Sequence, residues 1–227
     1  MGFYQRHLLP RCIDCVCSSP SLSRLRALVV PRAAGVVLEL GAGSAPNLPF
    51  YDPSRVRRLI ALEPSAELRA LAAQRIQRSG RPADAFPVEL LDGVGEAIPL
   101  PDASVDSVVC TYTLCTVTDP ARTAAELMRV LRPGGRVHFA EHGLAGTERA
   151  RRWQQRIKPA WVPLAGGCHL TRRPPDLLRA AGFEVEWQEG LMGPSTAAWR
   201  LVDRLMHGYW GCATARIQAC PTTACGT

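Results

Sequence analysis

The chain has 227 residues, of which 47% are hydrophobic, which suits one α/β domain with a sizeable core. Its apolar runs stay well below the length of about 18 residues that a membrane-spanning helix needs, and its N-terminus lacks the apolar core of a secretory signal, so we expect a cytoplasmic protein. The formal net charge is +7, but the arginines are scattered and lack interleaved aromatics, which argues against nucleic-acid binding and leaves a peripheral lipid contact open.

Residues 1–34 are predicted to form a helical extension, with a helix over 22–30 that Pro31 ends. Upstream of it, cysteines form the pattern C-x-x-C-x-C at Cys12, Cys15 and Cys17. No second C-x-x-C or histidine pair completes a tetrahedral zinc site. Since these cysteines share a stripe with apolar residues, we expect reduced core cysteines and no metal.

The next element is a short apolar strand over 36–40 that runs directly into a glycine turn. Gly41 and Gly43 carry no side chains, so a ligand can lie almost against the backbone there. A second apolar strand, 56–62, ends at Glu63, about 20 residues after the turn, where a nucleotide-binding βαβ unit places an acid against ribose hydroxyls. This arrangement predicts an adenosine-containing cofactor.

The exact glycine pattern narrows the identity of that cofactor. A dinucleotide fingerprint requires a third glycine where this chain has Pro46, which disfavours a dehydrogenase. No Gly-Lys-Ser/Thr follows, which excludes a P-loop. S-adenosylmethionine, with a ribose and an adenine but no phosphate, fits the remaining pattern.

Strand and helix patterns alternate along the rest of the chain, which predicts an α/β, Rossmann-like, doubly wound and mostly parallel sheet of seven strands with helices on both faces. The further strands are expected over 88–91, 105–111, 136–141, 183–188 and 209–214, and the helices over 66–78, 120–131, 147–164, 175–181 and 196–206. We assign residues 1–215 to a single domain, with 143–175 as a substrate-side insertion and 216–227 as a disordered tail.

Four segments, VLELGAG, LEP, GEAIPLPDASVDSVV and ELMRVLRPGGRVHFAEH, resemble class I S-adenosylmethionine-dependent methyltransferases in order and spacing. MGFYQRHLLPR, NLPFY, TLC, EH and GCHLTRR extend the likeness to a bacterial branch related to methyltransferase-like proteins that methylate thiols; some relatives are labelled phospholipid N-methyltransferases. The resemblance implies methyl transfer to a small molecule, with a thiol favoured over a lipid amine or a phenolic metabolite. A non-catalytic protein that binds S-adenosylmethionine is a further alternative.

Two positions depart from the family pattern. Ala45 replaces the last glycine of a G-x-G-x-G loop, which is tolerable if its φ stays negative. Val94 stands where the family often has an acidic or polar residue, so we expect backbone groups to read the adenine amine.

The predicted cofactor site collects residues at the ends of strands. Glu63 is expected to bind the ribose, Gly95 and Glu96 to lie at the adenine, and Glu39 is implied by the resemblance to lie beneath the methionine end. The full set of cofactor-binding candidates is Glu39, Gly41, Ala42, Gly43, Asn47, Glu63, Pro64, Gly95, Glu96, Thr111 and Leu114.

Methyl transfer from a sulfonium needs positioning and exclusion of water, and a thiol acceptor needs little help in losing its proton. His142 is a candidate proton acceptor or a structural histidine, and Cys115 a thiol near the methyl or a core cysteine. Aromatic and histidine side chains are candidates for the walls of the acceptor pocket: Tyr4, His7, Trp153, Trp161 and His169. No metal is expected, and the oligomeric state stays open.

Overall fold

The computed structural model describes residues 20–80, 85–192 and 206–216. Residues 1–19 of the expected helical extension lie outside this range. They include Tyr4, His7, Cys12, Cys15 and Cys17. All but the last residue of the helix expected over 196–206, and all but the first residue of the expected tail, also lie outside it.

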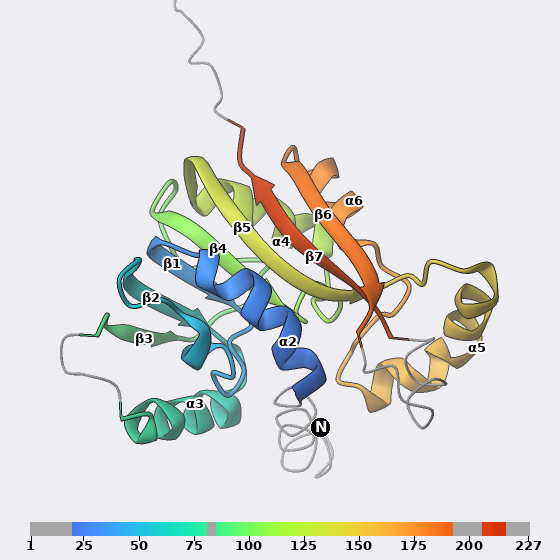
Figure 1. The fold of residues 1–227 in the computed structure, drawn as a ribbon, viewed down its shortest axis with the longest axis horizontal. Helices are drawn as coiled ribbons and strands as arrows, with labels where there is room; N and C mark the ends of the chain where they lie inside the picture. Colours follow the sequence, from blue (N-terminus) through green and yellow to red (C-terminus); the bar gives the residue numbers. More distant parts are fainter. Residues whose placement is uncertain (1–19, 81–84, 193–205, 217–227) are drawn as a thin grey trace, which may run out of the picture.

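A seven-stranded sheet, in the order β3-β2-β1-β4-β5-β7-β6, forms the centre of the molecule (Figure 1). The strands are β1 Gly35–Leu40, β2 Val56–Leu62, β3 Val88–Leu91, β4 Val105–Thr111, β5 Leu131–Gly143, β6 Glu184–Leu191 and β7 His207–Thr214. The first five strands pair in parallel, whereas β7 is antiparallel to both β5 and β6. Because the end of β6 pairs with the start of β7, through Leu191 and His207, the chain returns antiparallel and the sheet is mixed.

Helices cover both faces of the sheet, as expected for a doubly wound fold. The helices are α2 Pro20–Val29, α3 Ala66–Arg78, α4 Pro120–Val130, α5 Glu148–Leu164 and α6 Pro174–Ala180. The apolar sides of α2 and α3 share one buried cluster with Val37 and Val109, whereas those of α4 and α6 share the other with Leu38 and Val108. Neighbouring residues of one strand point to opposite faces, which explains why the central strands read as continuous apolar runs.

Strand β5 is longer than its sequence pattern indicates. It was expected over 136–141 but begins at Leu131, directly after α4. Its pairing with β4 passes from Leu131 opposite Val105 to Arg136 opposite Ser107, so Pro133–Gly135 form an irregularity within the strand. Helix α5 projects from the end of β5 (Figure 1) within the predicted insertion.

The carboxyl ends of the parallel strands meet at one edge. Leu40 at the end of β1 lies opposite Leu62 of β2 and Cys110 of β4, and Leu62 lies opposite Leu91 of β3. The chain order of the strands reverses between β1 and β4, and open α/β sheets bind ligands outside such a point. The fold therefore brings the glycine turn and the loops after β2, β3 and β4 together.

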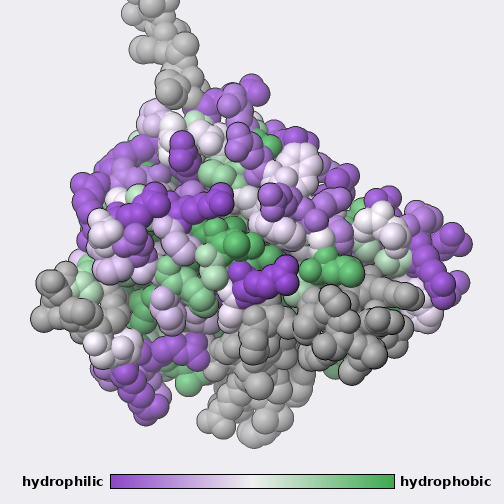
Figure 2. All heavy atoms as spheres, viewed as in Figure 1, coloured by the Kyte–Doolittle hydropathy of each residue, from purple (hydrophilic) through white to green (hydrophobic). Residues whose placement is uncertain are grey.

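The surface on the side of α2 is mostly polar, with apolar side chains gathered near the middle, over this helix (Figure 2). Leu28 of α2 is 44% exposed. Among the described residues, we find no helix of sufficient length and apolarity to cross a bilayer.

Candidate active site

A cavity of about 350 Å³ lies at the edge where the strands end, a volume within the range of small-molecule sites. Ten of the predicted cofactor residues line it: Glu39, Gly41, Ala42, Gly43, Asn47, Glu63, Pro64, Gly95, Glu96 and Thr111. Leu114 does not, since its side chain is fully buried in the core. Tyr112 and Thr113, from the segment 111–115 that the sequence places at this edge, also line it, and lining residues that the sequence reasoning missed include Arg26 and Gly166.

The glycine turn follows β1 with a left-handed backbone at Gly41, φ 65°, and at Gly43, φ 56°. A Cβ atom at Gly41 would overlap the side chain of Thr113, whereas one at Gly43 would meet nothing within 4 Å. Ala45 also has a positive φ, 62°, so the condition under which alanine would replace glycine without strain is not met. Its amide donates to the carbonyl oxygen of Ala42 at 2.9 Å, which closes the turn in this conformation.

Glu63 is buried at the end of β2, 7% exposed, and points back to the glycine turn. One carboxylate oxygen accepts the amide of Gly43 at 2.9 Å and the other accepts that of Ser65 at 2.9 Å. Burial raises the pKa of this carboxyl, and the two amides partly offset that effect. Each oxygen keeps a second lone pair, so the carboxylate can still accept hydroxyl groups of a ligand.

Glu39 also lines the cavity and lies deeper, at 1% exposure. Its carboxylate accepts the side-chain amide of Asn47 at 2.9 Å and the hydroxyl of Tyr51 at 2.8 Å. Burial raises its pKa to about 7, against the lowering effect of these two hydrogen bonds. The Oδ1 atom of Asn47 is buried without a hydrogen-bond partner among the described residues, so this end of the cavity offers an acceptor to a bound cation.

The loop after β3 forms a third side of the cavity. Glu96 lines it, but its carboxylate accepts the amides of Thr118, at 2.7 Å, and Asp119, at 3.0 Å, at the start of α4. Val94, in the same loop, is 44% exposed. The Glu96 carboxylate thus anchors the loop after β3 to the start of α4. Backbone groups of this loop and the Val94 side chain then remain to face a ligand.

Arg26 and Tyr112 come from distant parts of the chain and contact each other at the cavity. Arg26 extends from α2, is only 2% exposed, and lies over the ring of Tyr112 with its guanidinium carbon 4.8 Å from the centroid. Tyr112 has a positive φ, 57°, and its hydroxyl donates to the carbonyl oxygen of Leu22 at 3.0 Å. The sequence did carry a signal, because Arg26 interrupts the apolar side of α2 between Leu22 and Val29.

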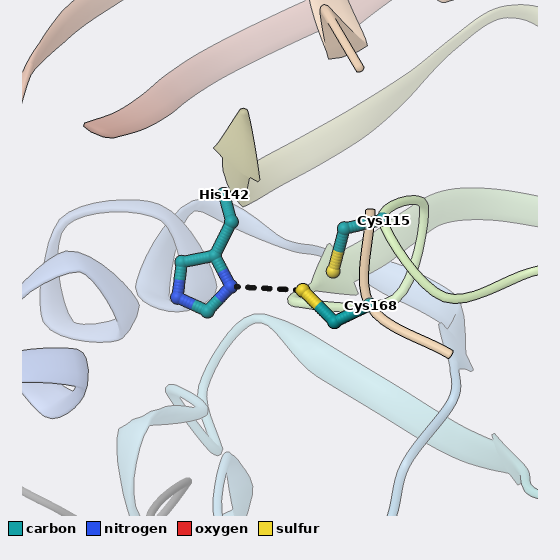
Figure 3. A group of neighbouring side chains, drawn as sticks. All are labelled: Cys115, His142 and Cys168. Atoms are coloured by element: carbon teal, nitrogen blue, oxygen red, sulfur yellow. Dashed lines mark hydrogen bonds between the residues drawn. The ribbon is translucent and has the colours of Figure 1, made fainter. Parts of the chain in front are cut away.

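The two catalytic candidates, Cys115 and His142, do not line the cavity. They form a buried cluster with Cys168 (Figure 3). The ring of His142 packs on Tyr112 with 4.9 Å between centroids, and its Nδ1 atom is 3.8 Å from the Cys168 sulfur. A hydrogen bond from Cys115 lowers the pKa of the Cys168 thiol and raises that of Cys115 itself. The three residues are 1 to 8% exposed.

The aromatic candidates for an acceptor pocket are dispersed. Trp161 packs against the cluster of Cys115, Cys168 and Leu170, while Trp153 is 49% exposed on α5. His169 is half-buried, and its amide donates to the carbonyl oxygen of Cys115 at 2.7 Å. None of these side chains lines the cavity.

The strand order and a cavity floored by a glycine turn and an acid at the end of β2 define a Rossmann-like protein that binds an adenosine-containing cofactor. Residues 38–139 match a methyltransferase-domain family. Human Thiol S-methyltransferase TMT1A is 34% identical over 191 residues, which cover 82% of this chain and 75% of the human protein. The chain belongs to the class I S-adenosylmethionine-dependent methyltransferases, and it is an enzyme that uses this cofactor.

Relatives with other stated acceptors are also similar. Phosphatidylethanolamine N-methyltransferase of Cereibacter sphaeroides is 33% identical over 125 residues, covering 55% of this chain and 59% of that one. The solved structure of Haemonchus contortus phosphoethanolamine N-methyltransferase 2 superposes with a TM-score of 0.70 at 13% identity, covering 95% of this chain and 60% of that one. At that identity the structural likeness supports the fold alone.

The two glycines of the turn should respond differently to alanine. Both substitutions impose a strained positive φ, at a cost of about 1 kcal/mol or more, but only Gly41→Ala also overlaps Thr113. We expect Gly41→Ala to lower the free energy of unfolding by at least ~2 kcal/mol more than Gly43→Ala. Gly43→Ala should instead weaken S-adenosylmethionine at least ~10-fold, because its methyl group projects into the ligand space. Urea unfolding and calorimetry measure the two effects, and equal losses of stability would contradict this assignment.

Glu39 should make the stability of the protein depend on pH. Its pKa of about 7 in the folded state lies above the ordinary value of 4.5, so its stabilising contribution is complete below pH 4.5 and is lost as the pH rises through 7. The difference corresponds to about 3 kcal/mol. Glu39→Gln cannot ionise and should gain that amount relative to the unmodified protein between pH 5 and pH 8. A constant difference in urea unfolding across this range would refute the buried, protonated carboxyl.

Proposed function

We propose that the enzyme transfers the methyl group of S-adenosylmethionine to the sulfur of a small-molecule thiol. The observation that carries this proposal is that the acids around the cavity already accept hydrogen bonds from the protein. Glu39, Glu63 and Glu96 all accept hydrogen bonds from the protein, and no described lining residue is a histidine. A thiol suits such a site because it is partly ionised near neutral pH and needs little general-base catalysis. The name of the human relative supports the same acceptor.

We place the cofactor in the cavity in the orientation that its polar lining favours. Glu63 and the turn would hold the ribose, and the loop at Gly95 the adenine. The methionine end then lies over Glu39 and Asn47, whose buried Oδ1 atom suits an ammonium group. Arg26, buried at the same end, would bind the carboxylate. The bound cofactor supplies an activated methyl group on a sulfonium, while the protein positions it and excludes water.

This orientation places the acceptor on the side of Tyr112. His142 and Cys115 lie just behind that residue with Cys168, so we assign their contribution to the acceptor end of the site. Trp161, which packs against the same cysteines, belongs to this side as well.

The role of Arg26 can be separated from its contribution to folding. Arg26→Ala should weaken S-adenosylhomocysteine at least ~10-fold, the effect expected for losing a charge-assisted hydrogen bond. It should leave 5′-methylthioadenosine, which lacks the amino-acid end, within about 2-fold in calorimetry. Arg24→Ala, at an exposed position of the same helix, is the matched control. Equal losses for both ligands would mean that Arg26 is structural.

The acceptor can be tested with three matched compounds, thiophenol, aniline and phenol, that differ only in the nucleophilic atom. We expect release of S-adenosylhomocysteine with thiophenol at a rate at least ~100-fold above that with either analogue. A thiol needs little general-base catalysis, whereas an amine or a phenol would depend on acids that already accept hydrogen bonds from the protein. Faster turnover of aniline or phenol would reject the thiol as the acceptor. Cofactor binding without turnover of any compound would favour a non-catalytic binding protein.

A further inference from the structure

Three side chains with metal-ligating atoms converge from three distant parts of the chain. Cys115 follows β4, His142 lies near the end of β5, and Cys168 follows α5. Their sulfur and nitrogen atoms all lie within 4.8 Å of one another. Figure 3 shows both sulfur atoms turned toward each other, with the imidazole Nδ1 facing the Cys168 sulfur.

We propose that Cys115, Cys168 and His142 bind a zinc-type divalent metal ion and leave one coordination position open for the thiolate of the methyl acceptor. The binding of the ion stands on the geometry of these residues alone. Only the identity of its fourth ligand rests on the proposed thiol acceptor. Two cysteines and one histidine with an open fourth position form a recognised ligand set of catalytic zinc.

The distances suit a tetrahedral ion after small side-chain movements. Bonds of about 2.3 Å to sulfur and about 2.0 Å to nitrogen place tetrahedral ligand atoms about 3.5 to 3.8 Å apart. The Nδ1 atom of His142 is 3.8 Å from the Cys168 sulfur. Rotation of side chains alone can bring atoms within 4.8 Å of each other to these separations.

The backbone around the three residues is held in place by hydrogen bonds that join their elements. Glu141, next to His142, accepts the amide of Cys115 at 3.3 Å. The amide of His169, next to Cys168, donates to the carbonyl oxygen of Cys115 at 2.7 Å. These backbone hydrogen bonds fix the relative positions of the chain segments from which the three side chains extend.

The charge balance also favours an ion. Metal-bound cysteines are thiolates, and two thiolates neutralise a divalent ion. The guanidinium of Arg172 lies nearby but donates to the carbonyl oxygens of Leu114 and Val117, at 2.7 and 2.8 Å. It therefore braces the loop of Cys115, and a metal ion would supply the charge for the thiolates.

The position of the cluster suits an acceptor site. Tyr112, which packs on His142, lines the cofactor cavity, as do Thr113 and Thr116 on either side of Cys115 and Gly166 just before Cys168. An acceptor thiol would release its proton to solvent as its sulfur binds the ion. The sulfur electron pair then forms the new S–C bond while the bond from the methyl carbon to the sulfonium breaks, which yields a thioether and neutral S-adenosylhomocysteine.

The experiment must separate this site from the other cysteines of the chain. The full-length protein, and a background variant with Cys12, Cys15, Cys17, Cys220 and Cys225 replaced by serine, are loaded with Co²⁺ and titrated with Zn²⁺. We expect about one ion per chain in the background variant, with sulfur-to-cobalt charge-transfer absorption and the visible bands of a tetrahedral site. Absence of metal binding in this variant would overturn the proposal.

Substitutions in the background variant identify the ligands. Cys168→Ser and His142→Ala should each weaken Zn²⁺ at least ~100-fold in competition with a chelator, with circular dichroism as the check on folding. The matched control is Cys212→Ser, which replaces a half-buried free cysteine on β7 and should leave the affinity for Zn²⁺ unchanged. A Cys115–Cys168 disulfide found by mass spectrometry in place of bound metal would also overturn the proposal.

The fourth position is tested separately from turnover. Thiophenol should shift the cobalt spectrum of the background variant, whereas phenol should not. A cobalt spectrum that thiophenol does not change would contradict the open coordination position. Because metal binding is measured without methyl transfer, its failure is distinguishable from failure of the proposed activity, which the three-acceptor assay reports.

Discussion

The buried carboxylate of Glu141 is the interaction on which the arrangement of the site depends. It is fully buried, and it accepts the amides of Thr113, at 2.8 Å, and Leu114, at 3.0 Å, and the thiol of Cys110. Burial raises its pKa to about 7, against the lowering effect of these donors. A single side chain of β5 thereby satisfies the backbone of the loop after β4 at a place where unpaired amides would cost about 1 to 3 kcal/mol each. The loop can then turn sharply at the carboxyl edge of the sheet without water.

The effect of this anchor reaches the glycine turn through Thr113. Its hydroxyl donates to the carbonyl oxygen of Leu40 at 3.0 Å, at the end of β1, and its side chain occupies the space that a Cβ of Gly41 would need. Gly41 thus serves two requirements, a left-handed backbone and a close approach of two loops. The glycine in this motif is therefore required by a residue more than seventy positions further along the chain.

Most of the sheet, and most of the residues that line the cavity, could be predicted, because both are encoded by local patterns. Apolar strands, the turn at Gly41 and the acid at Glu63 are short-range signals whose spacing alone implies a nucleotide-binding unit. The antiparallel course of β7 depends on tertiary pairing and was not predicted. The left-handed conformation of Ala45 belongs to a local turn whose φ values the sequence pattern did not specify. Arg26 also escaped prediction, since an arginine on a helix is ordinarily solvated, and only the packing of α2 over Tyr112 buries it.

The residues proposed for the acceptor side come from segments that are distant in the sequence, so local patterns do not predict that they meet. The segment that matches the methyltransferase family, residues 38–139, contains the glycine turn, Glu63 and the loop after β3. His142 and Cys168 lie beyond it, and they meet Cys115 only because β5 ends beside the β4 loop and the chain returns after α5. The residues that the proposed function assigns to the acceptor thus come largely from segments outside the family match. If they bind the acceptor as proposed, their sulfur and imidazole atoms would favour a soft partner over an amine or a hydroxyl.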